Sequence, residues 1–109
     1  MPLSKIPGDI TIAGTLKTSG GRILNVTTVT DTYQILISDD VVICDKATAF
    51  TATLPVGAVG ARHYVKNIGV GTVTVDGGGD TIDGEATQDI DQWECMALVC
   101  HAANEWSVI

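Results

Sequence analysis

The sequence predicts an all-β fold on three observations. Val, Ile and Thr are abundant within a chain of 109 residues that is 45% hydrophobic, and such β-branched side chains suit a pleated surface better than a helix. Short apolar stretches are separated by Gly, Asp and Pro turn signals. No window of helical length shows a 3.6-residue period. We therefore expect one all-β domain, an antiparallel sandwich or small barrel of short strands with an extended N-terminal arm.

The arm is expected at residues 1–21, ahead of a β-rich globular domain at residues 22–109. Between residues 6 and 21, apolar and polar residues alternate between glycines, with too few apolar side chains to build a core. We expect this attachment segment to dock on the main domain or on other copies of the chain, with Gly20-Gly21 as a hinge. Its candidate attachment or oligomer-interface residues are Ile6, Ile10, Ile12 and Leu16.

The first strands of the globular domain are expected at residues 22–30 and 33–37. The continuous apolar run at residues 41–44 is typical of a strand buried on both faces. Residues 49–54 alternate between apolar and polar side chains. This strand should end at Pro55, because proline cannot donate a hydrogen bond to a sheet ladder.

The second half of the domain continues in the same manner. A strand is expected at residues 62–68, where alternation places His63, Val65 and Asn67 on one face. Another short strand should follow at residues 72–75. The chain should end in a hairpin, whose strands cover residues 93–101 and 105–109.

The charge distribution excludes several classes of partner. The net charge is −7, with 13 acidic residues against 6 basic ones scattered along the chain. A nucleic-acid binder needs a basic patch, and an anionic membrane surface would repel this chain. No apolar stretch reaches the length of a membrane span. Because residues 1–5 lack the apolar region of a signal peptide, we expect synthesis in the cytoplasm of the producing cell.

The cysteines and histidines predict neither a disulfide nor a metal site. Cys95 and Cys100 lie five positions apart, so on one strand they face opposite sides of the sheet. We expect both, and Cys44, to be small buried hydrophobic residues in a reduced protein. His63 and His101 are expected at strand edges.

The residues between Asp76 and Glu85 allow two interpretations. Asp76, Asp80, Asp83 and Glu85 are the densest acidic group, and the Gly-Asp run at 77–84 partly resembles the repeat of calcium-binding β-rolls. Those rolls hold each ion between tandem copies, and this chain has one copy. We favour tight turns built on Gly and Asp, and predict no metal, while calcium stays an open alternative.

The sequence also predicts no catalytic residues and no cofactor. It has no nucleophile elbow, phosphate loop or dinucleotide fingerprint. His101 would be a poor base for Cys100, since neighbouring strand residues face opposite ways. The remaining enzymatic alternative is a glycosidase using paired carboxylates, which would need a deep cleft.

The aromatic residues indicate a second candidate function. Aromatic side chains in strands are usually core or interface anchors, and this is the interpretation we favour. Exposed rings can also stack on sugars, which would make the chain a carbohydrate-binding receptor-recognition module. The candidate glycan contacts are then Tyr64, Trp93 and Trp106.

The order of several short motifs resembles a module of bacteriophage and prophage virion proteins, in particular tail fibres and head fibres, over residues 8–109. The motifs are Gly8-Asp9-Ile10-Thr11-Ile12-Ala13-Gly14, Thr30-Asp31-Thr32-Tyr33-Gln34-Ile35-Leu36-Ile37-Ser38-Asp39-Asp40, Phe50-Thr51-Ala52-Thr53-Leu54-Pro55, Val65-Lys66-Asn67-Ile68-Gly69, Asp80-Thr81-Ile82-Asp83-Gly84 and Trp106-Ser107-Val108-Ile109.

This resemblance implies a non-enzymatic structural protein located on the virion. It implies a β-rich homotrimer, which we expect to contact capsid or tail proteins, and a trimer converts a weak contact into avidity. A host surface glycan is the further partner that the carbohydrate-binding alternative would add. The chain is shorter than a usual tail fibre and lacks a long shaft. We therefore expect a small head fibre, a capsid decoration protein or an excised terminal domain.

Overall fold

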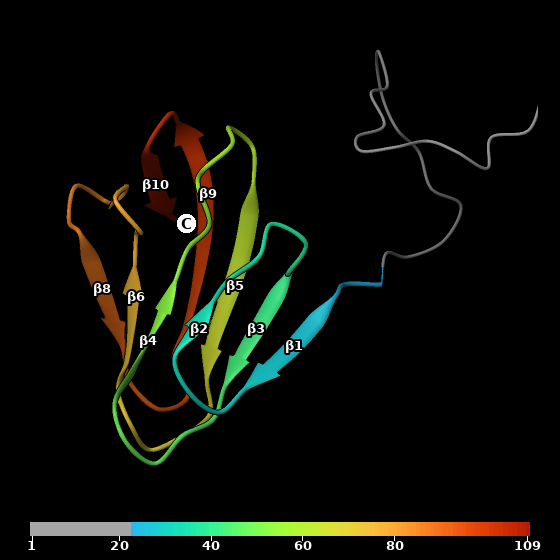
Figure 1. The fold of residues 1–109 in the computed structure, drawn as a ribbon, viewed down its shortest axis with the longest axis vertical. Helices are drawn as coiled ribbons and strands as arrows, with labels where there is room; N and C mark the ends of the chain where they lie inside the picture. Colours follow the sequence, from blue (N-terminus) through green and yellow to red (C-terminus); the bar gives the residue numbers. More distant parts are fainter. Residues whose placement is uncertain (1–22) are drawn as a thin grey trace, which may run out of the picture.

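The computed structural model describes residues 23–109 and confirms the all-β prediction. Ten strands form two sheets, and the described residues include no helix that could cross a membrane (Figure 1). The expected arm, with Ile6, Ile10, Ile12 and Leu16, lies outside the described residues. The strands are β1 (Val26–Val29), β2 (Tyr33–Gln34), β3 (Val41–Cys44), β4 (Phe50–Thr53), β5 (Arg62–Asn67), β6 (Val73–Asp76), β7 (Thr81–Ile82), β8 (Thr87–Ile90), β9 (Cys95–Ala102) and β10 (Glu105–Val108).

The chain winds through its first six strands as a short solenoid. The larger sheet has the order β1-β3-β5-β9-β10-β7, and the smaller sheet has the order β2-β4-β6-β8. From β1 to β6 each strand therefore lies in the sheet opposite its predecessor (Figure 1). Val26 pairs with Val41 and Val41 with Tyr64 in one sheet, while Phe50 pairs with Val73 in the other. Three coils thus stack on one another.

The expected antiparallel pairing holds for only three strand pairs. β5 with β9, β9 with β10, and β6 with β8 are antiparallel. The other five pairings are parallel. Four of these pairings follow from the winding: consecutive strands from β1 to β6 lie in different sheets, so each pairs with a strand one full coil away that runs in the same direction. The fifth joins β7 to β10. Only β9 and β10 form a hairpin, whereas β8 and β9 pair antiparallel with the earlier strands β6 and β5.

The core lies between the two sheets. In β4, the buried side chains are Phe50 and Ala52, and Leu54 continues this face, as the alternation predicts. In β3, Val42 and Cys44 are fully buried, but Val41 and Ile43 are only half-buried. The prediction of burial on both faces is therefore wrong for β3, because no further layer of the described residues covers the outer face of the larger sheet.

The coils also stack through their lower loops, which are residues 30–32, 45–49, 68–72 and 91–94 at the bottom of Figure 1. A Cβ atom added at Gly69 would lie 2.4 Å from the backbone of Lys46, and one added at Gly71 would lie 2.2 Å from the backbone of Thr48. Real Cβ atoms do not approach so closely. Glycine is therefore required where one coil crosses the next.

Candidate functional site

One end of the solenoid presents two unprotected strand edges. β1 begins the larger sheet and β2 begins the smaller one, so each has a partner on one side only among the described strands. Neither strand carries a charged residue. Edge strands are usually protected by charges, because their free backbone groups can pair with another chain. This end is suited to contact with a further segment or subunit.

Apolar side chains gather beside the β1 edge. Asn25 joins this strand to the loop after β2: its backbone N–H donates to Oδ2 of Asp40 at 2.7 Å, and its Nδ2 donates to the carbonyl of Ser38 at 2.8 Å. The apolar residues that flank these bonds are all exposed to solvent. We name them the open coil end: Ile23, Leu24, Val26, Leu36 and Ile37. Contiguous exposed apolar surface of this kind marks interaction sites.

An open depression of about 500 Å³ adjoins this surface. It is lined by Ile37 and Asp40 from one loop and by Gly60, Ala61 and Arg62 from the next coil. Asp40 and Arg62 bring opposite charges to its walls. The depression therefore extends the open coil end with polar groups that could fix the orientation of a partner.

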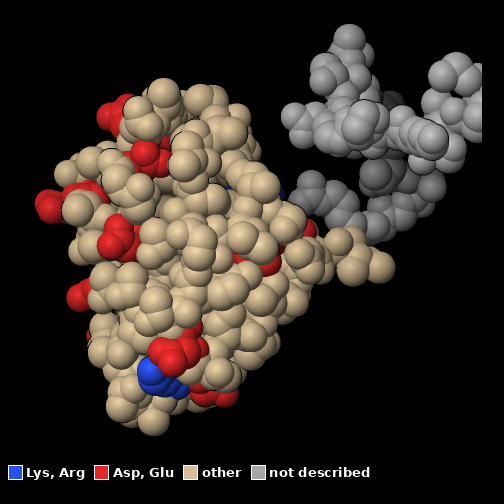
Figure 2. Space-filling view, viewed as in Figure 1, with Lys and Arg blue, Asp and Glu red and all other residues tan. Residues whose placement is uncertain are grey.

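The opposite side of the molecule is acidic. Figure 2 shows acidic side chains along the side that holds β6 and β8, and few toward β1. The residues involved are Asp76, Asp83, Glu85, Asp89 and Asp91. Charges on β8 and its flanking turns protect this edge from further strand pairing. The two edges of the solenoid thus differ in chemistry.

A buried carboxylate joins the two sheets behind the open coil end. Asp39 accepts hydrogen bonds from Tyr33 Oη at 2.7 Å, Thr27 Oγ1 at 2.8 Å and the Leu36 N–H at 2.9 Å. Burial alone would raise the pKa of Asp39. These hydrogen bonds, with the attraction of His63, outweigh burial and hold the pKa below its ordinary value.

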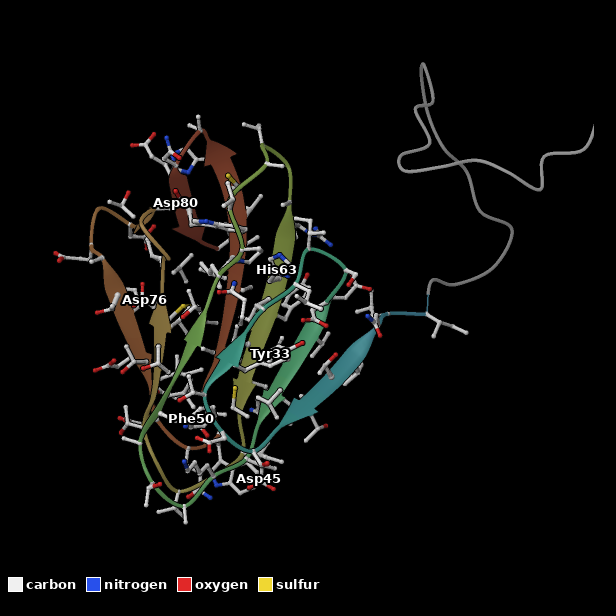
Figure 3. All side chains as sticks on the ribbon, viewed as in Figure 1. Tyr33, Asp45, Phe50, His63, Asp76 and Asp80 are labelled. Carbon is white, nitrogen blue, oxygen red and sulfur yellow. The ribbon has the colours of Figure 1, made fainter. Side chains whose placement is uncertain are left out.

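His63 lies inside the protein and not at a strand edge, which corrects the sequence-based expectation. It is 1% exposed, and its Nδ1–H donates to the Asp39 carbonyl at 2.6 Å. Figure 3 places His63 and Tyr33 between the sheets. Nε2 of His63 has no hydrogen-bond partner within residues 23–109. His63 shares one face of β5 with the buried Val65. That alternation in the sequence was the signal that His63 is buried.

The three candidate glycan contacts lie in different environments. Trp106 is 1% exposed, so its ring is not available to a sugar, which corrects that candidate. Tyr64 lies half-buried on the outer face of β5, with the Arg62 guanidinium 5.8 Å from its ring centroid. Trp93 is 65% exposed in the loop before β9. Of the three, only Trp93 presents most of its ring to solvent.

The cysteines differ in accessibility. Cys44 and Cys100 are buried as expected, but Cys95 is exposed, which corrects the prediction for that residue. Cys95 and Cys100 lie on opposite faces of β9, as their spacing predicts. Burial raises the pKa of the Cys44 thiol to about 11. Its thiolate form is therefore scarce at neutral pH.

The acidic residues of the suspected calcium segment take part in turns and capping contacts. Asp76 Oδ1 accepts from the Gly78 N–H at 2.8 Å, and Asp83 Oδ1 accepts from the Val108 N–H at 3.2 Å. Asp80 Oδ2 accepts from Trp106 Nε1 at 3.3 Å. Within residues 23–109 no three His, Cys, Asp or Glu side chains converge as metal ligands would.

Comparison with known proteins adds no family. No family model matches the chain, and no curated protein matches it.

Proposed function

We propose that this chain is a non-enzymatic structural protein of a bacteriophage virion, a fibre or capsid decoration module that assembles as a homotrimer. The observation that carries the proposal is the open coil end, where uncharged strand edges meet exposed apolar side chains. The resemblance of residues 8–109 to virion modules supplies the location and the trimer. The open coil end and the resemblance together favour assembly, and not catalysis, as the function of this surface.

The charge distribution supports a contact between N-terminal segments and globular domains. Residues 1–22 hold one acidic and three basic residues, a net charge of +2, whereas residues 23–109 hold 12 acidic and three basic ones, a net charge of −9. Opposite charges favour such an encounter. The apolar residues Ile6, Ile10, Ile12 and Leu16 are the proposed contacts of this segment, either with other copies or with the capsid or tail.

Light scattering after size exclusion tests the assembly. A solution mass of about three times the 11.4 kDa of the chain is expected. Val26→Lys places a charge on the β1 edge and should dissociate the trimer. The matched control is Thr87→Lys, which also places a lysine at an exposed position, on the β8 edge, and should leave the mass unchanged. A monomeric wild type, or a trimer that tolerates V26K, would contradict the proposed interface.

The virion location has its own test. Purified phage particles from the source strain should contain the chain in stoichiometric amounts by mass spectrometry. Its presence only in the soluble lysate, with none on particles, would refute this part of the proposal.

A further inference from the structure

Trp93 combines exposure with backbone strain. It occupies the loop at residues 91–94, where its φ is 71° and its side chain is 65% exposed. Positive φ is a genuine outlier for a bulky residue, since its Cβ crowds the backbone. A glycine would fit this turn without strain. Packing does not explain the choice of tryptophan, because most of the ring is in solvent.

The surrounding structure forces this conformation. The Trp93 N–H donates to the Asn67 carbonyl at 2.6 Å, and Lys66 Nζ donates to the Trp93 carbonyl. Asn67 is itself fully buried, and its Nδ2 donates to the carbonyl of Gly71 at 2.8 Å. Both ends of the Trp93 backbone are therefore fixed by β5. Strain that a rigid framework maintains at an exposed residue is typical of functional sites.

We propose that Trp93 is the stacking platform of a binding site for uncharged saccharides. An indole face packs against the C–H face of a sugar ring, while hydroxyl groups around the ring need acceptors and donors. The loop supplies acceptors in the carboxylates of Asp91 and Glu94, and Gln92 adds its amide, whose Nε2 also donates to the Ile68 carbonyl at 3.3 Å. A protein partner is a poorer fit, because Trp93 and Val70 are the two large exposed apolar residues of the lower loops and together offer too little apolar area.

The hydrogen bonds of the loop leave acceptors for such a ligand. Asp91 Oδ1 accepts from Thr72 Oγ1 at 3.1 Å, and Glu94 Oε1 accepts from the Asp91 N–H at 2.6 Å. Asp91 Oδ2 and Glu94 Oε2 have no partner within residues 23–109. The same two carboxylates repel anionic sugars and nucleic acids. Among saccharides, this charge favours an uncharged ligand.

The site lies away from the proposed assembly surface. Trp93 belongs to the lower loops, whereas β1 begins at the other end of the strands, at the open coil end (Figure 1). Every residue named for the site comes from one chain, so saccharide binding does not depend on a trimer. If the chain is trimeric, three identical sites raise the avidity for a glycan surface.

An array of neutral hexose and N-acetylhexosamine oligosaccharides provides the probes. Binding by wild type is compared with Trp93→Ala, Trp93→Gly and Trp93→Phe, and with the control Val70→Ala, which truncates another exposed apolar residue of the lower loops. A bound saccharide should also change tryptophan fluorescence, and the signal comes from Trp93 because Trp106 is buried.

The expected result is a loss of affinity of about tenfold or more in W93A and W93G, a smaller loss in W93F, and none in V70A. W93G should unfold at the wild-type temperature or above, since glycine relieves the strain. This separates lost binding from lost folding. The proposal is overturned if the wild type binds no neutral saccharide, binds only anionic ones, or if W93G binds as the wild type does.

Discussion

The hydroxyl of Tyr33 donates a 2.7 Å hydrogen bond to Oδ2 of Asp39, a carboxylate that is only 3% exposed. Tyr33 belongs to the smaller sheet, and Thr27, which donates to the other carboxylate oxygen, belongs to the larger one. The carboxylate therefore connects the two sheets of the first coil. Buried carboxylates need such donors, because an unpaired one is costly.

Tyr33→Phe should lower the free energy of unfolding by about 1–3 kcal/mol, because it leaves a buried charged acceptor without one donor. Urea denaturation followed by circular dichroism measures the change. Tyr64→Phe is the matched control: it removes the same hydroxyl from the outer face of β5, and we expect a change within about 0.5 kcal/mol. Equal effects of the two substitutions would show that the Asp39 contact adds nothing to stability.

Asp39 should also give the protein a defined acid sensitivity. The pKa of Asp39 is lowered in the folded state, so its contribution to stability is fully present above the unfolded pKa of about 3.9. That contribution is lost as the pH falls through the lowered folded pKa. Unfolding free energies of the wild type and Asp39→Asn, measured from pH 6 downward, should differ by a constant amount at first and converge below about pH 4. A difference that is independent of pH would rule out this linkage.

Local patterns predicted most strands, because alternation depends on adjacent residues. The strand bounds near β3 to β6 and the terminal hairpin agree with the structure to within a few residues. β8 was missed, since only Ile90 of its four residues is buried and no alternation is visible. β7 was missed because its two residues lie within a run of turn residues.

The solenoid winding of the chain could not be predicted from the sequence, for a different reason. Paired residues in the larger sheet lie 15 positions apart from Val26 to Val41 and 23 apart from Val41 to Tyr64. A solenoid is recognised in a sequence by a fixed period, and these coils have none. The open coil end was equally hidden, because its two segments are distant in the sequence and are brought together by the bonds of Asn25 and of Thr27 to the loop after β2.

Gly71→Ala should be strongly destabilising. Its Cβ would lie 2.2 Å from the carbonyl of Thr48, so the stacked lower loops would have to separate. We expect a loss of about 3 kcal/mol or more in the free energy of unfolding, beyond typical overpacking. Gly60→Ala is the comparison, since an added Cβ meets nothing within 4 Å and only the φ of 93° opposes it. That cost should be near 1 kcal/mol. A larger cost for Gly60→Ala than for Gly71→Ala would argue against close stacking of the lower loops.

Asp80 should be a stabilising acceptor in the last coil. Its Oδ2 accepts from Trp106 Nε1 at 3.3 Å and from the Gly57 N–H at 3.2 Å, and Asp80 is 8% exposed. Asp80→Ala removes the acceptor of both donors, which should cost about 1–3 kcal/mol for each donor left unpaired. Asp80→Asn retains an amide oxygen that can accept, so its cost should be smaller.

The Asp80 variants should be compared by fluorescence-monitored denaturation in a Trp93→Phe background, where tryptophan emission reports on Trp106 alone. Asp80→Ala should then change the emission maximum together with the denaturation midpoint, because the indole N–H loses its partner. Asp76→Ala is the control, since its carboxylate bonds an exposed backbone N–H and not the indole. If D80A and D76A shift the midpoint equally and neither alters the emission, the Asp80–Trp106 bond does not stabilise the core, and Trp106 is held by apolar packing and by the backbone pairing of β10 with β9 and β7.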